Sequence, residues 1–332
     1  MTVRSVRVEL EPVAAVVQRL AVLLAAGVAP VSAWRYLADA GGPQSRRLQK
    51  IVRALDAGTT VADAIVASAQ GAREAQTEAT PRRAGPTPRS RRRSSDAPDA
   101  AAWRGLAAAW FVATAAGAPL AASLRDFATG LRDLAQTERD LATALAGPAA
   151  TAKLVLVLPA VGVVFGVVLG FNSLATLFTS VPGLVCLGAG TALLVAARAW
   201  NRALLARARP ADLTPGLAMD LMAIAVSGGA SLVRATELVT RARQRCGLQA
   251  DGLTSIAEVL ELSRRAGVPA AALLRSEADE ARRQARSIGE RKAATLAVTL
   301  MLPLGLCVLP AFMLLSVAPL LIAILSSTVA VL

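Results

Sequence analysis

Two long uncharged runs, residues 154–197 and 293–332, stand out in the pattern of apolar and polar positions. A helix needs roughly 20 residues to cross a hydrocarbon core of about 30 Å. The first run therefore predicts two spans, at 154–171 and 180–198, separated by a more polar turn around Asn172. The second run predicts one span at 294–316 and an apolar tail at 317–332, because Pro319 interrupts it. Two crossings by this second run are the alternative.

The remaining segments, residues 1–150 and 199–292, show helical spacing without the alternation of strands. Apolar positions recur up to Gly27, and a new helix then runs through Trp34 and Leu37. The uncharged stretch 105–124 predicts packed helices and not a span, because it is rich in alanine and interrupted by Gly117 and Pro119. We therefore expect an all-α, polytopic membrane protein with two helical-bundle modules and about three transmembrane helices.

Residues 71–102 differ in composition from their surroundings, with four prolines and few large apolar side chains. Such a segment buries too little surface to offset the entropy of ordering the chain. We expect a disordered basic insertion in the first module. Its arginine cluster is a candidate contact for anionic lipid or a partner, whereas nucleic acid is not expected because the cluster lacks aromatic residues: Arg89, Arg91, Arg92 and Arg93.

The net charge of +13 fixes the predicted orientation. Basic residues flank the uncharged runs at Lys153, Arg198, Arg291 and Lys292, while the turn between the first two spans carries no charge. Basic flanks stay on the cytoplasmic side. We therefore expect both modules and the N-terminus to be cytoplasmic, with no signal peptide before them.

The sequence offers no catalytic, cofactor-binding or metal-binding constellation. It contains no histidine, its three cysteines are scattered, and it has no phosphate-binding loop, so we expect neither an enzyme nor a cofactor. Asp220 is interpreted as a helix-surface or capping residue. In the charged stretch 275–292, the spacing predicts pairs between Asp279 and Arg283 and between Arg286 and Glu290.

Three glycines of the first predicted span, Gly162, Gly166 and Gly170, fall on one helix face. Small residues at this spacing allow close helix packing in membranes. They predict a packing face against another span or subunit, with incidental glycine in an Ala- and Gly-rich chain as the alternative.

The two modules contain an internal repeat. Residues 115–125 read AAGAPLAASLR and residues 265–275 read RAGVPAAALLR, which aligns Gly117 with Gly267 and Pro119 with Pro269. Residues 25–37 likewise align with 227–239, which places Gly229 opposite Gly27. In each copy glycine ends one helix, proline suits the opening turn of the next, and a charged helix leads into a span.

This layout resembles the type II secretion system F superfamily, which includes the tight-adherence (Tad/Flp) proteins TadB and TadC. The first half resembles its turns at Gly27 to Ala33, Gly58 to Ile65 and Gly117 to Leu124, and the second half at Gly229 to Ala235 and Gly267 to Leu274. The turn at Gly58 has no counterpart in the second half. The second module is therefore either trimmed or completed by a partner.

The resemblance implies a multi-pass platform protein of the bacterial inner membrane, in a type IV or Tad-like pilus or a type II secretion machine. It implies as partners a cytoplasmic secretion ATPase, pilin subunits, membrane lipids, and a sister platform protein or a second copy of the chain. A small transporter or channel subunit is the alternative, which the scarcity of charge in the spans disfavours.

Overall fold

A computed structural model of the chain describes residues 10–78, 89–140, 181–207, 214–248 and 253–319, together with residues 143, 157, 161 and 321. These residues form helices and turns and contain no strand, so the predicted all-α fold is confirmed. The chain divides into two compact units. The first unit comprises Met1–Arg139 and Asp212–Ser287, and the second comprises Asp140–Ala211 and Ile288–Leu332.

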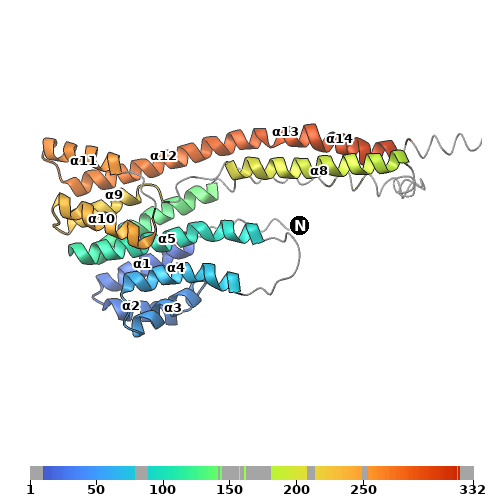
Figure 1. Ribbon diagram of the computed structural model, residues 1–332. Helices are drawn as coiled ribbons and strands as arrows, with labels where there is room; N and C mark the ends of the chain where they lie inside the picture. The colour runs from blue at the N-terminus through green and yellow to red at the C-terminus, as the bar shows by residue number, and fades with distance from the viewer. Residues whose placement is uncertain are drawn as a thin grey trace, which may run out of the picture. The chain divides into compact units, whose positions relative to one another are not determined.

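The first unit contains helices from both halves of the chain (Figure 1). The first half contributes α1 (Leu10–Ala25), α2 (Pro30–Asp39), α3 (Ser45–Asp56), α4 (Val61–Glu78), α5 (Arg89–Ala116) and a helix over 120–140. The second half contributes α9 (Leu217–Ser227), α10 (Leu232–Cys246), α11 (Leu253–Ala266) and α12 (Ala270–Thr299) as far as Ser287. Helix α5 is central, because it contacts α1 and α4 of the first half and α9 and α10 of the second.

Helix α5 occupies the centre because its middle is apolar on every face, the pattern of a fully buried helix. Trp103, Leu106 and the three alanines at 107–109 are all 0% exposed. The Trp34 ring of α2 lies against it, with centroids 6.5 Å from Trp103 and 5.9 Å from Trp110. The same core continues into α9 and α10, so both halves share one hydrophobic core.

Part of the predicted disordered insertion at 71–102 is helical. Helix α4 continues to Glu78 and α5 begins at Arg89, while residues 79–88 lie outside the described residues. At its C-terminal end the prediction is wrong, because Ala101 and Ala102 are 6% and 0% exposed. The composition contains few large side chains, but alanine is the best helix former and packs where large neighbours cover it.

The five glycines expected at module turns all lie at helix ends with positive φ, between 66° and 84°: Gly27, Gly58, Gly117, Gly229 and Gly267. At the first of these, the amides of Gly27 and Val28 donate to the carbonyls of Leu24 and Leu23, which closes the end of α1. Pro119 and Pro269 each stand immediately before the first residue of the next helix. A role for these residues beyond shaping the turns stays a prediction.

The second unit contains α8 (Val181–Arg207) and the end of α12, followed by α13 (Met301–Pro303), the π-helix η1 (Leu304–Val308), α14 (Leu309–Phe312) and the π-helix η2 (Met313–Val317). The widened turn η1 lies between Pro303 and Pro310. Proline removes a hydrogen bond from the helix ladder and widened turns accommodate the loss. Leu315 packs on α8 at Gly190, where an added Cβ would lie 2.5 Å from the leucine Cγ.

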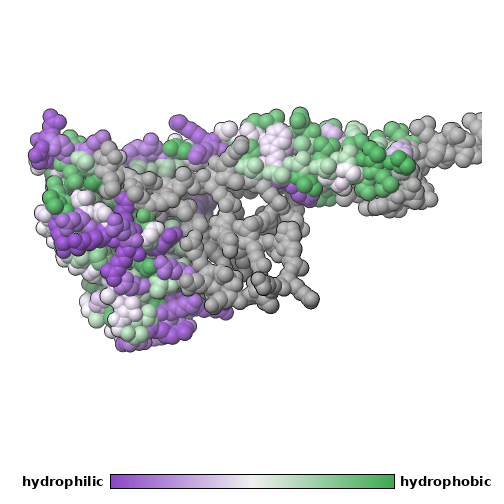
Figure 2. Space-filling view, viewed as in Figure 1, coloured by the Kyte–Doolittle hydropathy of each residue, from purple (hydrophilic) through white to green (hydrophobic). Residues whose placement is uncertain are grey.

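Two helical stretches are long and apolar enough to cross a membrane, Val181–Asn201 and Ala270–Val317. They include most of the predicted span at 180–198 and all of that at 294–316, whose boundaries stay predictions. Only 17% of the apolar window in α8 is buried, so its apolar side chains face outward, as a lipid-facing helix requires and a soluble core helix does not. Figure 2 shows this hydrophobic surface over α8 and the α13–α14 region. The predicted span 154–171, with Gly162, Gly166 and Gly170, lies outside the described residues.

Candidate functional site

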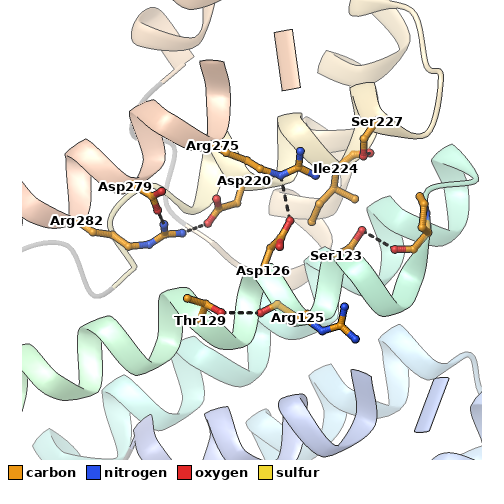
Figure 3. Close-up of polar contacts among 11 residues, drawn as sticks. Ser123, Arg125, Asp126, Thr129, Asp220, Ile224, Ser227, Arg275, Asp279 and Arg282 are labelled. Atoms are coloured by element: carbon orange, nitrogen blue, oxygen red, sulfur yellow. Dashed lines mark hydrogen bonds and ion pairs between the residues drawn. The ribbon is translucent and has the colours of Figure 1, made fainter. Parts of the chain in front are cut away.

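A polar cluster joins the two halves of the chain inside the first unit (Figure 3). It is formed where the helix over 120–140 meets α9 and the first turns of α12. We call it the junction cluster and define it by six residues: Asp126, Gly130, Asp220, Arg275, Asp279 and Arg282.

The centre of the junction cluster is an ion pair between Arg282 of α12 and Asp220 of α9. The two side chains are only 10% and 14% exposed, and the Arg282 Nη2 atom contacts Asp220 Oδ2. Arg282 Nη1 donates to Asp279 Oδ1 at 2.6 Å. Asp220 lies in the first turn of α9, where the positive end of the helix dipole favours a carboxylate. The guanidinium thus bridges a buried and a more exposed carboxylate.

Burial dominates the titration of Asp220. It raises the pKa of this carboxyl from 3.8 to about 6, and the charge and hydrogen bond of Arg282 act in the opposite direction. The sequence interpretation of Asp220 as a surface or capping residue is therefore wrong as to its exposure. The carboxylate is ionised and paired at neutral pH, but the folded protein takes up its proton more readily than the unfolded chain does.

The predicted pair between Asp279 and Arg283 is also corrected. Asp279 pairs with Arg282, whereas Arg283 pairs with Glu280 at 2.8 Å. Spacings of three and four residues both bring side chains together on a helix, so spacing alone did not decide between Arg282 and Arg283. The buried Asp220 carboxylate favours the pair between Asp279 and Arg282, because it holds the Arg282 side chain on the inner face of α12.

A second ion pair lies on the solvent-exposed side of the junction cluster. Arg275 Nε lies 3.0 Å from Asp126 Oδ2, and the two side chains are 41% and 50% exposed. Arg275 and Arg282 stand seven positions apart on α12, so they share one face of this helix. Helix α12 is therefore held by two arginines, one to the helix over 120–140 and one to α9.

Close backbone packing at the junction depends on three glycines that the sequence pattern does not single out. An added Cβ at Gly130 would lie 2.8 Å from Arg282 Nη2, and one at Gly216 would lie 2.7 Å from the Ala278 carbonyl oxygen. At Gly228 it would lie 2.4 Å from the carbonyl oxygen of Ala116. The turn that ends α5 and the turn that ends α9 are thus in direct contact.

A separate contact joins α4 to α10. Arg245 binds Asp63 in bidentate fashion, with Nε at 2.8 Å from Oδ1 and Nη2 at 2.5 Å from Oδ2. Thr60 Oγ1 donates to the same carboxylate at 2.7 Å. The hydrogen bond from Arg245 lowers the pKa of Asp63. The start of α4, just after the first-half turn at Gly58 that has no counterpart in the second half, is therefore one point where α10 contacts the first half.

The other residues expected at functional sites are distributed as follows. Arg89, Arg91, Arg92 and Arg93 lie in the first turns of α5, and their side chains are outside the described part of the structure. Among the described residues, Cys186, Cys246 and Cys307 are free thiols, and no group of three His, Cys, Asp or Glu side chains has the geometry to hold a metal ion.

Comparison with known proteins gives one family match. Residues 16–168 match the family model described as type II secretion system (T2SS), protein F. The chain carries a type II secretion system F domain. The superfamily expected from the module turns is thus confirmed, while the Tad-like subtype stays a prediction. No curated protein and no solved structure gives a significant match.

The matched type II secretion system F domain covers the helices of the first half and extends to residue 168. The family is one of structural platform proteins of secretion and pilus machinery. Together with the outward-facing apolar helices of the second unit, the domain identifies a membrane protein. The junction cluster joins this matched domain to α9 and α12, which lie beyond the match.

Proposed function

We propose that the chain is an inner-membrane platform protein of a type IV or Tad-like pilus or a type II secretion machine. In this role it couples a cytoplasmic secretion ATPase to the assembly or export of pilin subunits. The observation that carries the proposal is the type II secretion system F domain over residues 16–168, in a chain with apolar helices of membrane-spanning length.

Helix α12 supports a mechanical role. It belongs to a helical stretch, Ala270–Val317, that starts in the first unit and contains a candidate span. Its first turns are held by Arg275 and Arg282. A force applied by an ATPase to the first unit would therefore reach the spanning segment along α12 and the shorter helical segments that follow it.

The proposed topology and partners follow from charge and family. Arg198, Arg291 and Lys292 flank the candidate spans, and basic flanks favour the cytoplasmic side. The first unit and the N-terminus are then cytoplasmic and the protein is multi-pass. The ATPase would bind the first unit, and pilins, membrane lipids and a sister platform protein or second copy would contact the spans.

The test combines genetics with binding. Deleting the gene should abolish surface filaments or the secreted product, and the full-length chain should restore them. The purified chain in lipid nanodiscs should also bind the cognate secretion ATPase, with empty nanodiscs as the control. Normal filaments and secretion in the deletion strain, together with no ATPase binding, would refute the proposal.

A further inference from the structure

A small basic pocket lies at the N-terminal end of α3, away from the junction cluster. It has a volume of about 220 Å³ and is lined by Pro43, Gln44, Arg46, Arg47, Lys50 and Ser68. Three of these side chains are cationic and none is acidic.

Two of the three cations have no counter-ion among the described side chains, which exclude those of residues 71–98. Arg47 contacts Asp99 and lies with its Cζ 5.3 Å from the centroid of the Trp103 ring, so its charge is compensated and its position fixed. Arg46 and Lys50 are exposed and form no ion pair within the described part of the chain. They stand four positions apart and are neighbours on the surface of α3.

The placement of these cations is electrostatically unfavourable in the empty pocket. The first turn of α3 carries Arg46 and Arg47 and no acidic residue. Positive side chains at a helix N-terminus oppose the helix dipole, and neighbouring cations repel each other. An anion in the pocket would relieve both effects. Among the described side chains, the carboxylate that compensates these cations is that of Asp99, and it pairs with Arg47.

We propose that this pocket binds a phosphate group, held by Arg46 and Lys50 beside the N-terminal turn of α3. Arginine matches the geometry of phosphate oxygens and lysine adds a point charge. The lining contains no aromatic side chain to stack on a nucleobase and only one apolar residue, Pro43, to anchor a peptide. The phosphate is either free or the headgroup of an anionic phospholipid.

Lysine footprinting tests the site in the full-length protein in neutral detergent. The lysines of the chain are Lys50, Lys153 and Lys292, so acetylation followed by mass spectrometry reports on the pocket against two internal controls. At constant ionic strength, inorganic phosphate should protect Lys50 and leave Lys153 and Lys292 unchanged. A short-chain phosphatidylglycerol should protect Lys50 at a lower concentration than it protects the other two lysines, which flank the predicted spans. Protection by phosphate identifies the free ion as sufficient, and protection by the lipid alone identifies the headgroup.

Matched charge reversals separate a site from a general basic surface. Arg46→Glu should weaken the protection about tenfold or more, the effect of losing a hydrogen bond to a charged group. Arg125→Glu makes the same charge change at an exposed residue of the helix over 120–140 that does not line the pocket, and should change the protection less than about twofold at 0.15 M salt. Tryptophan fluorescence should show that both variants are folded.

Three results would overturn the proposal. The first is no protection of Lys50 by either probe. The second is equal weakening by Arg46→Glu and Arg125→Glu. The third is protection of Lys50 by an acidic peptide that is stronger than by phosphate, which would assign the basic face of α3 to a protein partner. None of these outcomes depends on ATPase binding or filament formation, so the platform function is tested separately.

Discussion

Removing the charge of Arg282 tests whether the junction cluster holds the two halves together. The substitution Arg282→Met keeps most of the aliphatic length of the side chain but leaves the Asp220 carboxylate, 14% exposed, without its partner. Removing one member of a buried ion pair costs about 3–5 kcal/mol. For a unit of this size, that corresponds to a fall in Tm of roughly 6–20 °C.

Arg283 provides the matched control on the next position of α12. Its side chain is 64% exposed and pairs with Glu280, which is 61% exposed. Exposed ion pairs contribute about 0–1 kcal/mol, so Arg283→Met should shift Tm by a few degrees at most. Both variants remove one positive charge from the same helix, so the comparison isolates burial and the contact with Asp220.

Intrinsic fluorescence is a suitable assay, because Trp34, Trp103 and Trp110 lie in the core of the first unit and only Trp200 lies in the second. Unfolding of the purified protein in detergent by heat or urea should therefore report mainly on the first unit. Equal loss of stability in Arg282→Met and Arg283→Met would refute the reasoning. The double variant Asp220→Leu, Arg282→Met should be more stable than Arg282→Met alone, because no unpaired charge remains buried.

Three further predictions use the same purified protein. The pKa of Asp220 in the folded protein, about 6, exceeds its ordinary value of 3.8. The free energy of unfolding of the wild type should therefore fall by up to about 3 kcal/mol relative to that of Asp220→Asn as the pH rises from 4 to 7. A difference in urea midpoint between the two proteins that stays constant over this pH range would contradict the prediction. Gly228→Ala should destabilise the protein by about 3 kcal/mol, because the added Cβ would meet the Ala116 carbonyl. Gly229→Ala should cost only about 1–2 kcal/mol, for its positive φ, because its added Cβ meets no atom within 4 Å. Equal shifts in Tm for the two variants would count against the contact between Gly228 and Ala116. Burial raises the pKa of the Cys246 thiol to about 11, so maleimide should label this thiol at pH 7.5 only after unfolding. Labelling is measured by peptide mass spectrometry, and rapid labelling of Cys246 in the folded protein would contradict the prediction.

The helices and turns of the first unit were predictable because their signals are local. Glycine at Gly27, Gly117 and Gly267 ends a helix through its own backbone freedom, and the apolar spacing between such turns defines the buried faces. The uncharged runs are equally local signals. These signals also carried the resemblance to the type II secretion system F superfamily, which the family match over residues 16–168 confirms.

The junction cluster could not be predicted, because its residues are brought together by tertiary packing. Nothing in the sequence around Asp220 distinguishes a buried carboxylate from a capping one until Arg282, on another helix, lies against it. Gly130 and Gly228 likewise look like ordinary glycines in an Ala- and Gly-rich chain. Their importance lies in the Arg282 side chain and the Ala116 carbonyl that occupy the space where a Cβ would be.

The second half is short because the first half provides the packing surface that its missing helices would otherwise form. A complete copy would carry its own counterparts of α3 and α4, but here α9 and α10 pack on α5, and Arg245 binds Asp63 at the turn that the second half lacks. Among the described residues, α9 and α10 therefore share the core of the first half and do not form one of their own. A load applied to α9 or α10 should consequently be shared with α5 and move the first unit as one body.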